Sequence, residues 1–502
     1  MTRNSQVRIS LPTLSLDLLP QVENRGLEIP SARLLKAPET ILQLGWGKFM
    51  RGFVPDFVQS ANAHGHYQGR VLAVQRSADN RSSAARAQNC LYTLILRGLV
   101  DNRQIEVKRV IGSVSRVLAA DESWPEIEEA VRRRELRVIL SNCTETGLKF
   151  DAEDQLDTRP PRSFPGKLVR LLFERWKATD GRDADVAIIP TELVVNNGPL
   201  VCELLSRQAE AWELGERFVT WLRDSIHVAS TLVDRIVVGT PRAELLAQEC
   251  EAIGYRDDLL TCCEPYYLFA IQADEFTQQH FPMHIATPNV RFVEDLAPFR
   301  WRKLRVLNGP QMILTTLGIL LEFHVVSESV RDSQVGPFTE ETIWQEIIPA
   351  MGPDEVVANS RYARECYQRI GNPTVEHRLQ GIRVDLTTKN AIRLFPSIRD
   401  FMKLRQQLPK RLLLTLAATL AVALHVELQD VHADYIVKCW SASQPVSQES
   451  AVAFVQNVLS RLSEATHEEI DIPSIAPEVA KLFLRIRELG LRTVLAQQFL
   501  RS

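Results

Sequence analysis

The strongest constraint on the fold of this chain is an apolar stretch that stops at a glycine and leads into a helical pattern. Residues 39–44 form the apolar stretch, and Gly45 closes it, as expected of a buried strand. A helical pattern over residues 48–63 then leads to a second apolar run at residues 69–75. Strand, helix and strand in this order predict a βαβ unit.

The same alternation continues to about residue 190. The further expected strands are 92–97, 104–110, 137–142 and 185–190, and the further expected helices are 124–134 and 164–178. The first two of these strands flank Asp101-Asn102, which is a turn signal and predicts that they pair. Alternating strands and helices predict a Rossmann-like, doubly wound α/β sheet.

Beyond residue 290 the pattern changes to long apolar helices with few strand candidates. The expected helices cover residues 303–322, 340–350, 408–424 and 477–499. We therefore expect three parts: an N-terminal arm on the surface (1–36), a Rossmann-like dinucleotide-binding domain (37–290) and an all-α domain for substrate and catalysis (291–502). The predicted fold class is an α/β doubly wound sheet plus an all-α C-terminal domain.

Composition excludes several classes of protein. The 502 residues carry 59 Lys and Arg against 62 Asp and Glu, so no basic excess predicts a nucleic-acid partner. The longest apolar run, residues 412–426, contains Thr415, Thr419 and His425 and is too short to span a bilayer. We expect a buried helix there and no membrane partner.

The eight cysteines are scattered and form no CxxC pair or zinc-ligand spacing. This pattern predicts no metal site and no disulfide framework. It is typical of buried thiols in a reducing compartment, so we expect a cytoplasmic protein.

A glycine-rich segment lies between the first strand and the first helix. Residues 45–52 read Gly-Trp-Gly-Lys-Phe-Met-Arg-Gly, and such a turn lets backbone N–H groups approach a pyrophosphate at a helix N-terminus. The alternative is an ordinary turn. The second strand ends in Gln75 and Arg76, where dinucleotide sites usually place an acidic residue for the ribose. The choice between NAD and NADP is therefore open, with Arg76 either meeting a 2′-phosphate or pointing into solvent.

Three polar clusters are candidates for the chemistry. Residues 141–147 and 190–198 follow strand ends, where open sheets bind ligands, although both can also be loops that cap a helix. In a helix, steps of about 100° per residue place Lys303, Asn308 and Gln311 within one arc of about 140°. Apolar neighbours lower the pKa of a buried lysine toward use as a base. The alternatives are a solvated Lys303 and a helix that kinks at Pro310 or begins there.

Taken in order, these segments resemble the mannitol dehydrogenase family of long-chain polyol dehydrogenases, and in particular its tagaturonate reductase branch. The resemblance spans nearly the whole chain and is carried by residues 45–53, 91–98, 141–147, 190–198, 230–237 and 303–309, and by Asn372-Pro373 with His377. It implies an NAD-dependent, metal-independent oxidoreductase with its substrate between a Rossmann-like and a helical domain. The implied reaction interconverts D-tagaturonate and D-altronate in hexuronate catabolism.

The resemblance also implies roles for individual residues. Lys303 matches the catalytic lysine that exchanges the hydroxyl proton, Asn308 matches an asparagine that polarises the carbonyl oxygen, and Asn197 is a second donor. Gln311 completes the expected catalytic group. The expected cofactor contacts are Gly45, Gly47, Lys48, Phe49, Arg51, Gln75, Arg76, Asn142, Thr144 and Glu145. The expected substrate contacts are Glu192, His377 and Lys389, the last suiting the uronate carboxylate.

Three residues depart from the family pattern. Gln311 stands where the family has a histidine, and glutamine cannot relay a proton. Pro310 replaces a small residue, and Lys48 replaces an asparagine. Two alternatives therefore stay open: a dehydrogenase of another hexonate or polyol (fructuronate and mannonate, or mannitol), and a catalytically impaired paralogue that binds nucleotide. An epimerase with bound NAD is a third. The expected partner is a small sugar acid, and the sequence leaves open whether the chain is a monomer or a small homo-oligomer.

Overall fold

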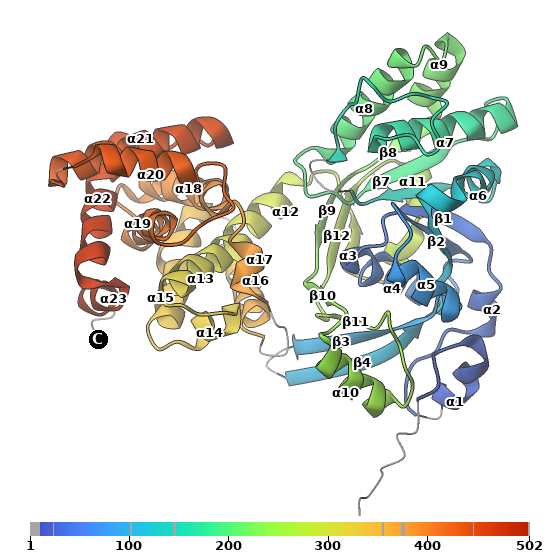
Figure 1. Ribbon diagram of the computed structural model, residues 1–502, viewed down its shortest axis with the longest axis horizontal. Coiled ribbons are helices and arrows are strands. Elements are labelled where there is room, and N and C mark those ends of the chain that lie inside the picture. The colour runs from blue at the N-terminus through green and yellow to red at the C-terminus, as the bar shows by residue number, and fades with distance from the viewer. Residues whose placement is uncertain are drawn as a thin grey trace, which may run out of the picture. The chain divides into compact units, whose positions relative to one another are not determined.

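The computed structural model describes residues 11–23, 25–100, 103–143, 147–353, 356–372, 377–444 and 446–499. The chain divides into two compact units, Met1–Leu296 and Ala297–Ser502, which we call unit 1 and unit 2. In Figure 1 the strands and helices of unit 1 run from blue to yellow-green, and the helices of unit 2 run from yellow to red.

Unit 1 is built on a six-stranded sheet in the order β5-β2-β1-β6-β7-β8, with every neighbouring pair parallel. The strands are β1 (Glu39–Leu44), β2 (Arg70–Gln75), β5 (Val114–Ala119), β6 (Val138–Ser141), β7 (Val186–Pro190) and β8 (Ile226–Val228). This is the strand order of doubly wound dinucleotide-binding sheets. The predicted fold class is therefore confirmed for unit 1.

Helices cover both faces of this sheet. Ile41 and Val71 belong to one core cluster with α4 (Val54–Ala63), and the next residue of each strand belongs to a second cluster on the other face. The second cluster includes apolar residues of α6 (Ala120–Arg132), α7 (Phe164–Thr179) and α8 (Asn197–Ala211). The strands β1, β2, β6 and β7 are buried on both faces and form apolar runs, which is why the sequence predicted them. The partly buried edge strands β5 and β8 were not predicted.

Unit 1 also contains two smaller sheets, with the orders β10-β11-β3-β4 and β13-β12-β9, whereas the sequence predicted a single doubly wound sheet. Their strands are β3 (Tyr92–Val100), β4 (Arg103–Ile111), β9 (Ser230–Asp234), β10 (Val237–Gly239), β11 (Thr261–Cys263), β12 (Leu268–Gln272) and β13 (Val290–Phe292). β3 and β4 pair antiparallel as predicted, while the expected turn residues Asp101 and Asn102 lie outside the described residues. The other helices are α1 (Leu19–Glu23), α2 (Ala32–Leu35), α5 (Asn80–Ala87), α9 (Glu216–Ser225), α10 (Ala243–Ile253) and α11 (Glu275–His280).

The prediction of a surface arm was wrong for its described part. Leu14, Leu19 and Val22 are buried and share a core cluster with Leu91 and Ile95 of the second sheet region. Their apolar side chains pack there because β3 presents an uncovered apolar face, a partner that lies far away in sequence.

The predicted helix over residues 48–63 is interrupted. It forms as α3 (Lys48–Arg51) and α4, separated by Gly52 and Phe53, and Phe53 has non-helical φ −130° and ψ −91°. A Cβ at Gly52 would lie 2.6 Å from Val237, so only glycine permits this close approach.

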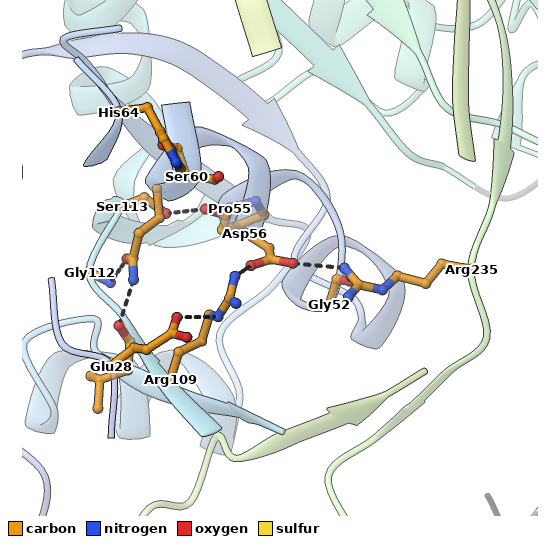
Figure 2. Close-up of polar contacts among 12 residues, drawn as sticks. Glu28, Gly52, Pro55, Asp56, Ser60, His64, Arg109, Gly112, Ser113 and Arg235 are labelled. Carbon is orange, nitrogen blue, oxygen red and sulfur yellow. Dashed lines mark hydrogen bonds and ion pairs between the residues drawn. The ribbon is translucent and has the colours of Figure 1, made fainter. Parts of the chain in front are cut away.

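A buried carboxylate joins α4 to two other parts of unit 1 (Figure 2). Asp56 contacts Arg109 of β4 at 2.7 Å and Arg235 at 3.0 Å. The Arg235 side chain is 0% exposed and also donates to the carbonyl oxygen of Gly52. Glu28 contacts Arg109 from the outside at 3.0 Å. Both arginines are therefore neutralised by carboxylates inside the fold.

Unit 2 is helical throughout its described part, which confirms the all-α prediction. Its helices are α12 (Ala297–Arg302), α13 (Gly309–Leu320), α14 (Val326–Arg331), α15 (Val335–Thr342), α16 (Val356–Ile370), α17 (Leu379–Ile382), α18 (Leu386–Arg405), α19 (Lys410–His425), α20 (Ala433–Ala442), α21 (Gln448–Thr466), α22 (Ile472–Leu489) and α23 (Leu491–Gln498). π-Helical segments cover Lys303–Asn308 and Ile343–Ile347.

Helix α19 contains the longest apolar run, and its residues from Leu412 to Ala423 are buried, as predicted. Within the described ranges, no helix is long and apolar enough to cross a membrane. Two expected boundaries were wrong. The helix over 477–499 begins earlier, at Ile472, and breaks at Gly490, whose φ is +78°. The stretch 340–350 includes the second π-helical segment.

Candidate cofactor cavity and catalytic segment

A cavity of about 630 Å³ lies at the carboxyl ends of β1, β2 and β6. Strand β1 lies between β2 and β6, so the cavity occupies the point where the strand order reverses, which is the ligand position of open α/β sheets. The strand ends and the residues directly after them contribute Leu44, Gly45, Val74, Gln75, Arg76, Asn142 and Cys143. Other segments contribute Ala120, Trp124, Gly147, Lys149, Phe150, Asp151, Arg162, Ser163, Phe164 and Lys167.

Gly45 forms the turn at the end of β1. Its φ is +134°, and a Cβ there would lie 2.8 Å from the carbonyl oxygen of Asn142. Its backbone N–H donates to Val74 at 2.8 Å, which ties the turn to β2. Glycine is required here both by the backbone angle and by the close approach to β6.

Gln75 supplies a test of whether the cavity suits a nucleotide. The residue is 5% exposed, and its Nε2 donates to the carbonyl oxygen of Ser77 at 2.6 Å and to Asp79 at 3.2 Å. Its Oε1 is buried without a hydrogen-bond partner. An orphaned acceptor beside the cavity fits a ligand that brings its own donor, such as a ribose hydroxyl. The cavity therefore fits a dinucleotide.

Three of the predicted cofactor contacts besides Gly45 line this cavity: Gln75, Arg76 and Asn142. The Asn142 amide donates to Thr191 Oγ1 at 3.0 Å, which fixes its orientation. Thr144 and Glu145 lie outside the described residues.

The other predicted contacts of the glycine loop are not among the lining residues. Arg51 is buried and donates to Thr261 Oγ1 at 3.2 Å and to the carbonyl oxygen of Trp46 at 3.1 Å. Burial lowers the pKa of its guanidinium below the ordinary value. Phe49 stacks on Phe53, with ring centroids 4.7 Å apart. Gly47 and Lys48 begin the four-residue helix α3, which is too short to carry a strong dipole.

Five polar lining residues lie outside the predicted clusters: Lys149, Asp151, Arg162, Ser163 and Lys167. Lys167 lies in the first turn of α7, and Ser163 caps this helix by accepting from the N–H of Gly166. Only the tertiary path of the segment between β6 and α7 brings these residues to the cavity. In the sequence, Ser163 indicates only the start of a helix and not a residue of a cavity wall.

Glu192 and Asn197 follow β7 and are held by hydrogen bonds within unit 1. Glu192 is 3% exposed and accepts from Ser141 Oγ at 3.0 Å and the N–H of Cys143 at 2.8 Å. Burial raises the pKa of this carboxyl, and these hydrogen bonds oppose the shift. The Asn197 amide donates to the carbonyl oxygen of Glu192 at 3.1 Å and to Thr231 Oγ1 at 3.2 Å. Both side chains therefore tie strand ends together.

In unit 2, Lys303 and Asn308 are the first and last residues of a π-helical segment. The 100° steps assumed for this stretch were wrong, because a π-helix bonds residue i to residue i+5 and has a wider turn. Such turns are frequent at functional sites. Pro310 lies at the start of α13, where its missing N–H breaks no helical bond.

The Asn308 side chain is half-buried and has no hydrogen bond to any described residue, and it does not cap α13. Its amide is therefore available to a ligand. Lys303 is also half-buried. Gln311 Nε2 lies 3.4 Å from Nε2 of His377, so the structure brings these two predicted residues together.

Lys389 lies in α18, and its Nζ donates to the carbonyl oxygen of Ile382 at 3.2 Å. Among the residues that the structure describes, no group of three or more His, Cys, Asp or Glu side chains is placed to hold a metal ion.

Comparison with known proteins covers both units. The family model for the mannitol dehydrogenase Rossmann domain matches residues 39–284, and the model for the mannitol dehydrogenase C-terminal domain matches residues 295–482. The altronate oxidoreductase of Bacillus subtilis is 31% identical over 464 residues, which are 92% of this chain and 95% of that protein. The altronate oxidoreductase of Pectobacterium atrosepticum is 33% identical over 473 residues, which are 91% of this chain and 96% of that protein.

Two solved structures share the fold. The mannitol 2-dehydrogenase of Pseudomonas fluorescens, solved as a ternary complex with NAD and D-mannitol, aligns with a TM-score of 0.75 at 19% identity, over 96% of this chain and 99% of that chain. A D-sorbitol dehydrogenase in substrate-free form aligns with a TM-score of 0.81 at 19% identity, over 96% of this chain and 100% of that chain. With family models matching both units, the chain belongs to the mannitol dehydrogenase family.

Proposed function

We propose that the protein is an NAD-dependent oxidoreductase that interconverts D-tagaturonate and D-altronate. The observation that carries this proposal is the similarity to altronate oxidoreductases at 31% and 33% identity over more than nine-tenths of the chain. The cavity at the reversal of strand order in unit 1 supports the cofactor part of the proposal.

The cavity residues would hold the dinucleotide. Gly45 leaves room for the chain of phosphates to approach the backbone, and Gln75 Oε1 accepts from a ribose hydroxyl. Asn142 closes the crevice from β6. NAD, when bound, supplies the acceptor for the hydride that leaves the substrate carbon.

Lys303 and Asn308 carry the proton chemistry of the proposal. In the oxidation of altronate, Lys303 as a neutral amine takes the proton of the hydroxyl whose carbon loses hydride, and in the reduction it returns that proton. The Asn308 amide donates to the same oxygen and stabilises the negative charge that develops on it. Its lack of a partner among the described residues supports this role.

The remaining predicted residues complete the proposal in smaller roles. Lys389 is a cation that suits the carboxylate of a sugar acid. Gln311 and His377 are 3.4 Å apart, which fits a shared hydrogen bond to the substrate. Asn197 and Glu192 already have hydrogen-bond partners in unit 1, so their proposed role is to hold the ends of β6 and β7 in place.

The test is the absorbance of reduced nicotinamide with D-tagaturonate, D-fructuronate and D-fructose as substrates. We expect rapid oxidation of NADH with tagaturonate, and a loss of kcat of about 10²–10⁴-fold in Lys303→Ala, the usual range for a general acid or base. Lys403→Ala, which removes an exposed lysine of α18, is the matched control and should retain activity. Faster turnover of fructuronate or fructose would move the assignment to another hexonate or polyol.

The departure at Gln311 defines the second candidate, a catalytically impaired relative that binds nucleotide. Gln311→His separates the two, because it restores the titratable ring of the family pattern. A large gain of turnover in this variant would support impairment. Unchanged or reduced turnover would show that glutamine belongs to the working site.

We also propose that the enzyme acts in the cytoplasm. None of the eight cysteines forms a disulfide bond, and Cys90, Cys250, Cys263 and Cys366 are buried. Free thiols in this number fit a reducing compartment.

A further inference from the structure

The end of β2 differs from that of a site built to reject a 2′-phosphate. Dinucleotide sites selective for NAD place a carboxylate there, which binds the ribose hydroxyls and repels a phosphate. Here Gln75 ends the strand and Arg76 follows it, and both line the cavity. A neutral acceptor at this position binds a ribose hydroxyl without repelling a neighbouring anion.

The nearest carboxylate after β2 is already engaged. Asp79 caps α5 by accepting from the N–H groups of Arg81 at 2.8 Å and Ser82 at 3.2 Å. It also forms an ion pair with the Arg81 side chain at 2.6 Å, and it is not among the residues lining the cavity. Asp79 therefore does not replace the missing acidic residue.

Four cations line the same cavity: Arg76, Lys149, Arg162 and Lys167. Arg162 is paired with Glu153 at 3.2 Å and with Asp151, which also lines the cavity, at 3.9 Å. Among the described residues, no ion pair reaches Arg76 or Lys149. The cavity therefore has positive charge that the described part of the chain does not neutralise.

Lys167, another of the four cations, lies in the first turn of α7. Its Nζ donates to the carbonyl oxygen of Arg162 at 2.8 Å. Burial lowers its pKa, the charge of Asp154 opposes this shift, and the charge of Arg76, which lines the same cavity, acts in the same direction as burial. The 16-residue helix α7 begins beside the cavity wall, but its N-terminus is already engaged, because the buried Asp154 carboxylate accepts from the N–H of Ser163 at 2.8 Å.

We propose that Arg76, with Lys167, forms a subsite for the 2′-phosphate of adenosine, so that the protein binds NADP(H) as well as NAD(H). The guanidinium fork suits a phosphate, and the buried Gln75 Oε1 takes the remaining ribose hydroxyl. This inference rests on the proposed dinucleotide cofactor and extends it.

The experiment compares two probes by isothermal titration calorimetry: adenosine 2′,5′-bisphosphate and 5′-AMP, which differ only in the 2′-phosphate. We expect the full-length protein to bind the bisphosphate more tightly than 5′-AMP. In Arg76→Glu the dissociation constant of 5′-AMP divided by that of the bisphosphate should fall at least about tenfold, as expected for loss of a charge-assisted hydrogen bond. Lys36→Glu makes the same charge change at an exposed lysine away from the cavity and should leave the ratio unchanged.

A 5′-AMP affinity equal to or higher than that of the bisphosphate would overturn the inference, and so would an unchanged ratio in Arg76→Glu. A titration with NADH separates this failure from failure of the proposed function. NADH binding without any advantage for the 2′-phosphate removes only the subsite. Absence of binding by both NADH and NADPH removes the proposed cofactor as well. Arg76 is exposed, so the variant should fold, which its thermal melting curve verifies.

Discussion

Two of the arginine-containing sites of unit 1 differ in whether carboxylates neutralise the arginines. Around Asp56, Arg109 and Arg235 are neutralised by carboxylates at 2.7 and 3.0 Å, and the Arg235 side chain is completely buried (Figure 2). At the cavity, Arg76 is exposed and has no ion pair with any described residue. A buried charge that the fold neutralises depends on its partner, because loss of that partner would leave the charge buried and uncompensated. A charge without an ion pair at a cavity wall is available to a ligand.

The largest effect is expected when the first cluster is broken. Asp56→Ala leaves Arg235 buried without its carboxylate and should lower the free energy of unfolding by about 3–5 kcal/mol. Urea unfolding of the wild type and the variant measures this loss of unfolding free energy. Glu129→Ala is the control, because its partner Arg133 is exposed and such pairs contribute about 0.5 kcal/mol or less. A loss below about 1 kcal/mol for Asp56→Ala would show that water solvates Arg235 in its place.

The buried carboxylate of Glu346 in unit 2 extends the comparison, because it forms no ion pair with any described residue. Glu346 accepts from the N–H groups of Arg411 at 2.9 Å and Leu412 at 2.8 Å, at the beginning of α19. Burial raises its pKa to about 7, and these hydrogen bonds oppose the shift. The folded state therefore holds a proton that the unfolded chain releases above pH 4.5, its reference pKa, and stability should fall as the pH rises from 4.5 to about 7.

Glu346→Gln should remove this pH dependence, because an amide does not titrate in that range. The change expected for the wild type over the window is at most about 3 kcal/mol. Unfolding midpoints of both proteins, measured at intervals across the window, provide the test. Parallel pH profiles for the two proteins would show that another group is responsible.

The next effect concerns the carboxylate that joins the cavity wall to a helix cap. Asp79→Ala removes the cap of α5 and the acceptor for Gln75 Nε2, and should cost about 1 kcal/mol. Asp79→Asn retains a capping oxygen and should cost less. Hydrogen bonds hold the pKa of Asp79 at about 2 against burial, so this stabilisation is present above its ordinary pKa of 3.8 and is lost as the pH falls toward 2. Equal unfolding free energies for the Ala variant and the wild type would contradict the role as a cap.

The sequence predicted those parts of the fold whose signal is local. The predicted bounds of β1, Glu39–Leu44, agree with the structure because both faces of this strand are buried, and Gly45 marked the turn after it. The break at Gly52 was not predictable, because its cause is contact with Val237, almost two hundred residues away. The burial of Leu14 against the second sheet was missed for the same reason.

For the candidate site, the sequence indicated the strand ends but not what surrounds them. Gln75, Arg76 and Asn142 were found because parallel strands end at one edge of a sheet. Lys149 and Lys167 were missed because only the path of the chain between β6 and α7 brings them there. The π-helical turn at Lys303–Asn308 escaped as well, since a periodicity of 3.6 residues was assumed throughout.

The smallest expected effect is a difference in salt dependence between the Asp56 cluster and the cations of the cavity. Between about 0.1 M and 1 M ionic strength the Debye length falls from about 10 Å to about 3 Å, which screens exposed charges far more than buried ones. Binding of adenosine 2′,5′-bisphosphate should weaken several-fold over this range, because Arg76 is exposed. The difference in unfolding free energy between the wild type and Asp56→Ala should stay constant, because Arg235 is buried. A salt-sensitive Asp56 difference together with salt-independent nucleotide binding would reverse the assignment of the two clusters.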